Sequence, residues 1–277
     1  MMQKNAMDHL EFYITNVCNL TCENCRSFNN HRFSGIYKFD QNAISQWSKK
    51  LDLAHFSILG GEPNLHPHLE QWMLGLRKAW PNAVAELITN GTHLSKVKGL
   101  HNMLAEYNYE LQISVHGKNL RELIAKEIFL AFGELKIQKI ENNKIWFRTD
   151  KGVLIDLQNN EHLQEILFID NDFNLHHSDP AKAHANCMHK SCHHMIDNKI
   201  YKCSVVGLLP EFLKQQGKST DHLISYHGID VHSVSKQTIA SLSDPIPHCA
   251  ICPESPKSIH LDAILKKHVN FKKDTPS

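Results

Sequence analysis

Short apolar segments alternate with amphipathic ones through the first half of this chain, and this alternation limits the folds that are available to it. Residues 10–15, 55–59, 85–89 and 109–115 are rich in branched and aromatic side chains, which predicts strands. Residues 68–80 carry apolar side chains at helical spacing, which indicates one buried helix face. Because strands and helices alternate at intervals of roughly 25 to 40 residues, the pattern predicts an α/β fold with parallel strands joined by right-handed crossovers.

Two of these predicted strands have one polar and one apolar face. In residues 109–115, Glu110, Gln112 and Ser114 alternate with apolar residues, and residues 10–15 repeat the pattern. Parallel strands are normally covered on both faces, so a polar face indicates a wet or ligand-filled interior. This pattern suits a barrel with a polar lumen better than an open sheet, which remains the alternative. The candidates for substrate contacts in such a lumen are Glu11, Tyr13, Glu86, Gln112 and Ser114.

Composition and charge exclude several classes of function. The chain has 277 residues, with 30 basic and 29 acidic side chains, so its formal net charge is +1. This balance offers no extended basic surface for nucleic acid. The first residues lack the apolar core of a signal peptide, and no run approaches the ~18 apolar residues of a membrane span. We therefore expect a cytoplasmic protein with no membrane segment.

The eight cysteines fall into a front group and a back group. In a reducing compartment, clustered thiols indicate metal ligands or catalytic groups rather than disulfides. The front group, Cys18, Cys22 and Cys25, directly follows the first predicted strand. Zinc prefers four ligands in a structural site, so it would need a fourth such as His31. An iron–sulfur cube held by three cysteines has one iron without a protein ligand, which can bind a small molecule.

Polar or glycine-rich stretches also follow the other predicted strands. They are Gly-Gly-Glu-Pro at residues 60–63, Thr-Asn-Gly at residues 89–91 and Ser-Val-His-Gly at residues 114–117. Each stretch alone predicts no more than a turn. Ligands gather at the carboxyl ends of strands in parallel α/β folds, so stretches in register at successive strand ends predict one common site.

The Cys-x3-Cys-x2-Cys stretch, followed by Gly-Gly-Glu-Pro, gives residues 8–130 a specific resemblance to the radical S-adenosylmethionine (SAM) enzymes. The resemblance implies a partial (β/α)6 TIM-like barrel, in which Cys18, Cys22 and Cys25 hold a [4Fe-4S] cluster whose free iron chelates SAM. It places Gly60, Gly61, Glu62 and Pro63 beside the methionine amino group, and Thr89, Asn90, Ser114 and His116 beside the ribose or carboxylate. Asn24 stands among the adenine contacts, where many members have an aromatic residue.

The chemistry implied by this resemblance is reductive cleavage of SAM to a 5′-deoxyadenosyl radical, which takes a hydrogen atom from a substrate in the lumen. An electron donor such as flavodoxin or ferredoxin would supply the electron. The protein would then orient the reactants and exclude water.

The back group consists of Cys187, Cys192, Cys203, Cys249 and Cys252. Residues 196–201 predict a hairpin, because Asp-Asn adopts the left-handed turn conformation, and this hairpin would bring Cys192 and Cys203 together. A Cys-x2-Cys pair, Cys249 and Cys252, completes a four-thiolate site for zinc or an iron–sulfur cube. The region resembles the SPASM and twitch extensions of radical SAM enzymes, which implies one auxiliary [4Fe-4S] cluster. The spacing in those extensions also admits Cys187, so the choice among the five stays open.

These patterns divide the chain into a partial barrel over residues 1–175 and a small C-terminal auxiliary-cluster extension over residues 176–277. Further predicted elements are a capped helix from Asn119, a hairpin or strand over residues 144–149 and 153–157, and a strand over residues 166–169.

Three functions fit this reading. The first is a radical SAM enzyme that acts on a small-molecule or nucleotide-like substrate, with the auxiliary cluster for electron transfer or substrate anchoring. The second is a radical SAM enzyme that modifies a peptide. The third is a non-catalytic zinc or iron–sulfur protein, which would leave the Gly-Gly-Glu-Pro and Thr-Asn-Gly stretches as coincident turns.

Overall fold

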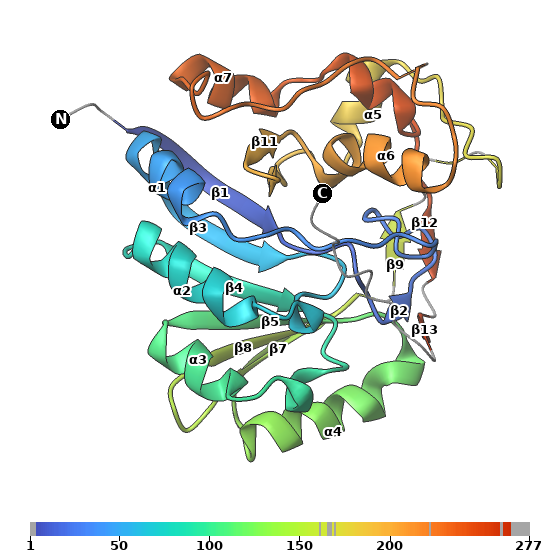
Figure 1. The fold of residues 1–277 in the computed structure, drawn as a ribbon. Coiled ribbons are helices and arrows are strands. Elements are labelled where there is room, and N and C mark those ends of the chain that lie inside the picture. Colours follow the sequence, from blue (N-terminus) through green and yellow to red (C-terminus); the bar gives the residue numbers. More distant parts are fainter. Residues whose placement is uncertain are drawn as a thin grey trace.

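The computed structural model describes residues 4–160, 162–164, 168, 170–221, 223–260 and 263–266. Its main feature is a nine-stranded sheet with the strand order β11-β10-β1-β3-β4-β5-β8-β7-β6 (Figure 1). In chain order these strands are β1 (Asn5–Tyr13), β3 (Leu51–Leu59), β4 (Val84–Thr89), β5 (Tyr109–Val115), β6 (Lys136–Glu141), β7 (Lys144–Arg148), β8 (Leu154–Asn159), β10 (His194–Ile196) and β11 (Lys199–Tyr201). The neighbours from β10 to β8 pair in parallel. The structure thus confirms a mixed α/β fold with a large, mostly parallel sheet.

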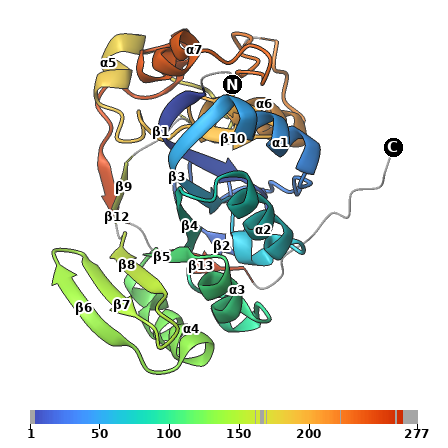
Figure 2. The same cartoon turned by 90° about the vertical axis from the view of Figure 1, so that its left-hand side faces the viewer.

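Helices connect the parallel strands and cover one face of the sheet. They are α1 (Gln41–Lys50), α2 (Leu69–Ala79), α3 (Leu100–Glu106) and α4 (Arg121–Phe132), and Figure 2 shows α1, α2 and α3 on the same side of the strands. Helix α2 confirms the predicted helix, because its buried residues include Leu69, Trp72, Met73 and Leu76. Phe12 and Phe56 meet Trp80 at the end of α2, so the apolar strand face packs against this layer.

The opposite face of the sheet carries a row of polar side chains. Register pairs Glu11 with Ser57, Ser57 with Glu86, and Glu86 with Glu110. Ser57 Oγ donates a hydrogen bond to Glu86 Oε2 over 3.2 Å. The predicted polar face is therefore present across four adjacent strands, β1, β3, β4 and β5.

The predicted cap of α4 is wrong. Leu120 occupies the N-cap position without a side-chain hydrogen bond, and a short 3-10 turn (Lys118–Leu120) precedes the helix. Asn119 instead donates a hydrogen bond from Nδ2 to Ala263 O over 3.0 Å. The side chain is diverted to a segment far away in the sequence, which local spacing does not reveal.

Both readings of residues 144–157 are partly right, because β7 and β8 form an antiparallel hairpin while β8 also pairs in parallel with β5. The strand predicted over residues 166–169 lies outside the described residues except for Phe168, which forms an isolated bridge with Leu175.

The C-terminal half joins the main sheet through its hairpin. Strands β10 and β11 are antiparallel, and β10 pairs in parallel with β1. Asp197 and Asn198 form the turn with φ of 47° and 60°, as predicted, and Trp47 Nε1 donates to Asn198 O over 3.0 Å. A second apolar core gathers around α6 (Ser204–Gln215) and includes Tyr13 and Phe28 from the first half. The two halves are therefore packed together rather than joined only by a linker.

The remaining elements lie above the sheet or beside its carboxyl edge. Helices α5 (Pro180–Ala185) and α7 (Lys236–Ala240) accompany α6 in the C-terminal half. The pairs β2 (Leu20–Thr21) with β13 (Ile264–Leu265), and β9 (His162–Gln164) with β12 (Ser258–His260), lie on the side to which the β1 and β3 arrows point (Figure 1). Among the described helices, none combines the length and apolar character needed to cross a bilayer.

The β10–β11 turn gives a test of the fold. Asn198 adopts a left-handed conformation, which costs about 1–2 kcal/mol for a residue such as alanine and little for glycine. We expect Asn198→Ala to lower the free energy of unfolding by about 1 kcal/mol, whereas Asn198→Gly should leave it unchanged or raise it. Urea denaturation of the two variants measures this difference, and equal destabilisation by both would contradict the turn.

Candidate functional site

A cavity of about 350 Å³ lies at the carboxyl ends of the parallel strands and has walls from both halves of the chain. Side chains of the first half and of the C-terminal half face each other across it. The lining residues that the argument below uses are Glu11, Cys18, Cys22, Cys25, Arg26, Asn29, Gly60, Gly61, Thr89, Asn90, Gln112, Ser114, His116, His189, Cys192, His194, Cys203 and Ser204. The strand-end stretches predicted to share a site therefore do so.

The front cysteines follow β1 in a loop that encloses one end of this cavity. Burial raises the pKa of Cys18 to about 12, with a smaller contribution from Glu62, and burial and the other two thiols raise that of Cys22 still further. Such thiols become thiolates only beside a compensating cation, as in a metal or iron–sulfur site. Asn90 Nδ2 lies 3.8 Å from Cys18 Sγ, and Asn29 Nδ2 lies 3.9 Å from Cys25 Sγ.

Asn24 does not line the cavity. It has a φ of 56°, in the left-handed region that asparagine tolerates better than most residues. Asn24 therefore turns the cysteine loop, and its place among the adenine contacts stays a prediction.

The backbone of Gly60 and Gly61 lies in close contact with the residues that precede Cys18. Gly61 N donates to Thr15 O over 2.6 Å, and Glu62 N donates to Val17 O over 2.7 Å. A Cβ atom on Gly61 would lie 2.3 Å from Val17 O, and one on Gly60 would lie 2.6 Å from Thr15 O. Glycine is required here because only a bare backbone fits this approach.

Neither Glu62 nor Pro63, which the resemblance places beside the methionine amino group, lines the cavity, and that contact stays a prediction. The Glu62 carboxylate is fully buried and accepts hydrogen bonds from Thr89 Oγ1 (2.7 Å), Asn90 N (2.8 Å) and Asn64 N (3.1 Å). Burial raises the pKa of Glu62 to about 7, while these hydrogen bonds act in the opposite direction. Pro63 begins a 3-10 turn (Pro63–Leu65). Glu62 thus ties the glycine stretch to the end of β4.

The ends of β4 and β5 contribute polar atoms to the opposite wall. Asn90 Nδ2 donates to Asn19 Oδ1 over 2.9 Å, and Asn19 Nδ2 donates to Thr92 Oγ1 over 2.8 Å. Ser114 Oγ accepts from Asn160 Nδ2 over 3.2 Å. Burial lowers the pKa of His116 to about 4, and its Nδ1 is a buried atom without a hydrogen-bond partner among the described residues. His116 therefore offers a neutral imidazole to a ligand.

Glu11 and His194 form a buried ion pair in the wall that faces the cysteine loop. They are register partners on β1 and β10, and Glu11 Oε2 lies 2.7 Å from His194 Nε2. Burial acts to raise the pKa of Glu11, but the charge and hydrogen bond of His194, with help from His9, bring it below the ordinary value. Of the predicted substrate contacts, Gln112 and Ser114 also line the cavity, whereas Tyr13 and Glu86 do not.

The back cysteines divide between two cavities. A small pocket of about 30 Å³ is lined by Cys187, Cys203, Cys249 and Cys252. Cys192 lines the main cavity instead, beside His189 and His194, while Cys203 lines both. The hairpin therefore brings Cys192 and Cys203 to the same cavity, as predicted, and Cys203 also reaches the back pocket.

Arg26 connects the two cysteine groups. It follows Cys25 directly, lines both cavities, and places Nη2 4.0 Å from Cys187 Sγ. Sequence reasoning missed Arg26 and Asn29, and it singled out neither His189 nor His194 among the histidines close to the back cysteines. The sequence offers a signal only for Arg26 and Asn29, which lie close to Cys25 along the chain. His194 is placed by strand register and His189 by the loop before it, and neither placement can be predicted from neighbouring residues.

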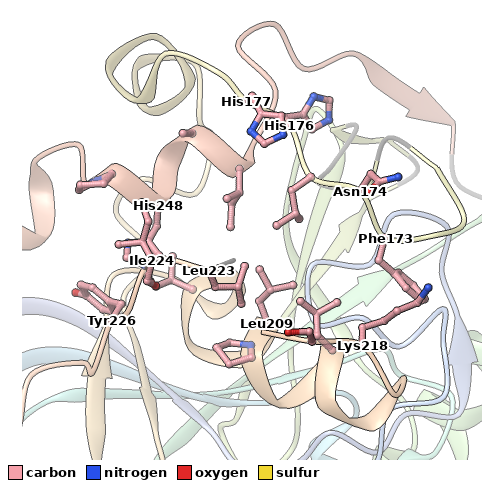
Figure 3. Close-up of a pocket in the computed structure, with 18 of the residues that line it drawn as sticks. Phe173, Asn174, His176, His177, Leu209, Lys218, Leu223, Ile224, Tyr226 and His248 are labelled. Atoms are coloured by element: carbon pink, nitrogen blue, oxygen red, sulfur yellow. Dashed lines mark hydrogen bonds between the residues drawn. The ribbon is translucent and has the colours of Figure 1, made fainter. Parts of the chain in front are cut away.

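Within the described ranges, no three His, Cys, Asp or Glu side chains converge closely enough to share one metal ion. A separate cavity of about 490 Å³ lies in the C-terminal half, between residues 172–177, α6, residues 218–226 and residues 247–251 (Figure 3). It contains none of the predicted site residues.

Comparison with known proteins gives remote structural matches. No family model matches the chain, and no curated protein matches it. A solved structure of BtrN in complex with AdoMet and 2-DOIA is 14% identical over 87% of this chain and 84% of its own, with a TM-score of 0.45. A structure of Streptococcus suis SuiB bound to S-adenosylmethionine is 17% identical over 45% of this chain and 37% of its own, with a TM-score of 0.28.

The Glu11–His194 pair predicts a pH-dependent loss of stability on mutation. We expect Glu11→Gln to lower the free energy of unfolding by about 2 kcal/mol at pH 7, because a buried charged hydrogen bond is lost. The pKa of Glu11 lies below its ordinary value of 4.5, so the stabilisation is complete above pH 4.5 and is lost as the pH falls through the folded-state pKa. Denaturation at pH 7 and pH 4 measures the difference, with the exposed Glu122→Gln as control. A difference that stays constant with pH would refute the ion pair.

Proposed function

We propose that this chain is a radical SAM enzyme. The observation that carries the proposal is the meeting of Cys18, Cys22 and Cys25 with the Gly60-Gly61 backbone and the ends of β4 and β5 around one cavity. Each stretch alone is explained by an ordinary turn, but turns have no reason to converge on three buried thiols. A purely structural zinc site would use the thiols and leave the polar wall of Thr89, Asn90 and His116 without a role.

The residues of the site fit a [4Fe-4S] cluster and SAM. Cys18, Cys22 and Cys25 would ligate the cluster, which supplies the electron for cleavage of SAM and has one iron free for its amino and carboxylate groups. The Gly60-Gly61 backbone, Thr89 and Asn90 would line the SAM site, and Ser114 and His116 would offer polar contacts to it. Asn29 and Asn90 would hold the thiolates of Cys25 and Cys18 through their amide N–H groups. Cys18 and Cys22 are buried, so the loop would limit the access of water to these two thiols.

The opposite wall would receive the substrate. Glu11 and His194 present a carboxylate and an imidazole, with Gln112 and Ser204 nearby in the lining. A cavity of about 350 Å³ that must also hold SAM favours a small substrate with hydroxyl or amino groups over a peptide segment. Both ring nitrogens of His194 face acceptors, Nε2 the Glu11 carboxylate and Nδ1 the carbonyl oxygen of Cys192, so His194 would orient this carboxylate toward the substrate. The eight cysteines are free, which agrees with the reducing cytoplasm and a flavodoxin or ferredoxin as electron donor.

The back pocket would hold one auxiliary [4Fe-4S] cluster, as in a SPASM or twitch extension. We assign its ligation to Cys187, Cys203, Cys249 and Cys252, because these four line one pocket. Cys192 would be left as a free thiol in the substrate cavity. Cys203 lines both cavities, so the auxiliary cluster would lie next to the substrate and could take an electron from it.

The first experiment measures iron, sulfide and zinc in anaerobically reconstituted protein, and then 5′-deoxyadenosine formed from SAM with dithionite. We expect about eight irons per chain and formation of 5′-deoxyadenosine. Cys22→Ala should form none, because one ligand of the SAM-binding cluster is gone, whereas Cys252→Ala should keep cleavage that is uncoupled from product. Zinc without cleavage would mean that the thiols are structural and that the proposed function is wrong.

A matched pair of variants tests the auxiliary ligands. Cys187→Ala should lose about four of the eight irons, because it removes one proposed ligand of the auxiliary cluster. Cys192→Ala should keep all of them, since its thiol faces the other cavity. Iron and sulfide content and the electron paramagnetic resonance spectrum of the reduced protein provide the readout. The opposite pattern would return Cys192 to the ligand set.

A further inference from the structure

Arg26 reaches from the front cysteine loop to the pocket of the back cysteines. It directly follows Cys25 in the sequence, and its Nη2 donates a long hydrogen bond of 4.0 Å to Cys187 Sγ. It lines the back pocket together with the four cysteines that we assign to the auxiliary cluster, and it also lines the chamber of the front cysteines. One side chain thus lies between the two groups of thiols.

The positive charge of Arg26 has no carboxylate partner among the described residues. None of their ion pairs includes Arg26, and no Asp or Glu side chain among them lines the back pocket. Lys190 and Lys202 stand in the same lining. A guanidinium stays protonated in proteins, so the charge of Arg26 is permanent. A partly buried cation needs a compensating charge, and the lining of the back pocket is therefore suited to an anion.

A cluster held by four thiolates would supply this anion. Its reduction adds further negative charge, so a cation beside it favours the reduced form and raises the reduction potential. A hydrogen bond to a ligand sulfur acts in the same direction, because it stabilises the more negative state. Arg26 offers both effects to the ligand Cys187 through one guanidinium.

We propose that Arg26 raises the reduction potential of the auxiliary cluster, by holding its positive charge and a hydrogen bond against Cys187. The inference rests on the auxiliary cluster of the proposed function. The step concerned is the gain of one electron by the oxidised cluster, which dithionite or a substrate radical would supply. Because Arg26 acts through Cys187, it is a positioning residue for this electron transfer.

The test is a redox titration of the reconstituted full chain with dithionite, followed by electron paramagnetic resonance. Loss of a signal in Cys187→Ala identifies that signal as the auxiliary cluster. Arg26→Gln removes the charge but keeps N–H donors. At a fixed solution potential we expect it to lower the ratio of reduced to oxidised auxiliary cluster about tenfold, a shift of about 59 mV to lower potential for one electron. Arg26→Lys keeps the charge and should stay within about twofold of the wild-type ratio.

Arg32→Gln is the matched control. Arg32 is exposed and lines neither cavity, so this variant loses the same formal charge at a distance from the back pocket. We expect it to leave the ratio unchanged. Iron content shows for each variant that both clusters are present. Loss of the auxiliary irons in Arg26→Gln but not in Arg26→Lys would also support the proposal, because only the charge distinguishes these effects.

Two results would overturn the inference while the auxiliary cluster stands. One is an unchanged ratio in Arg26→Gln, and the other is the same fall, or the same loss of iron, in Arg26→Lys as in Arg26→Gln. Wild-type protein that holds zinc or only about four irons in place of the auxiliary cluster would instead overturn that part of the proposed function, and this inference with it.

Discussion

The contact between the glycine stretch and the cysteine loop is the constraint on which the rest of the site depends. Two short backbone hydrogen bonds, from Gly61 N to Thr15 O and from Glu62 N to Val17 O, join the end of β3 to the end of β1. A side chain at position 60 or 61 would collide with the backbone that precedes Cys18. Glu62 then fastens the same stretch to Thr89 and Asn90 at the end of β4. Three strand ends are thereby fixed relative to the thiols, and a buried carboxylate acts as a structural support beside the ligand space.

The register of the parallel strands determines the polar wall of the cavity. Because β1, β3, β4 and β5 are parallel neighbours, Glu11, Ser57, Glu86 and Glu110 stand in one row across the sheet. Glu11 lines the cavity, as does Ser114 further along β5, while Ser57 donates a hydrogen bond to Glu86 within the row. Strand β10 adds His194 opposite Glu11, so the C-terminal half supplies the partner that keeps this carboxylate ionised in a buried place. The chamber is incomplete without that strand.

Much of the fold could be predicted from the sequence because its signals are local. Strand alternation, the helical face of Leu69, Trp72, Met73 and Leu76, and the Asp197-Asn198 turn each depend on neighbouring residues alone. The wrong cap has the opposite cause, because Asn119 bonds to Ala263, far away in the chain. The hydrogen bonds of Glu62 with Thr89 and Asn90 likewise join segments that are distant in the sequence. No periodicity within one segment reports such partners.

The cysteines show the same limit more sharply. A hairpin places residues on alternating faces, so knowledge of the turn alone suggests that Cys192 and Cys203 meet. In the structure both do line the front cavity, but Cys203 also lines the back pocket, which the turn alone does not predict. Cys187, which precedes the hairpin by a loop, reaches the back pocket instead and lies near the guanidinium of Arg26. Cys192 is therefore the one back cysteine that lines the front cavity alone, whereas Cys203 lies between the two cavities and lines both.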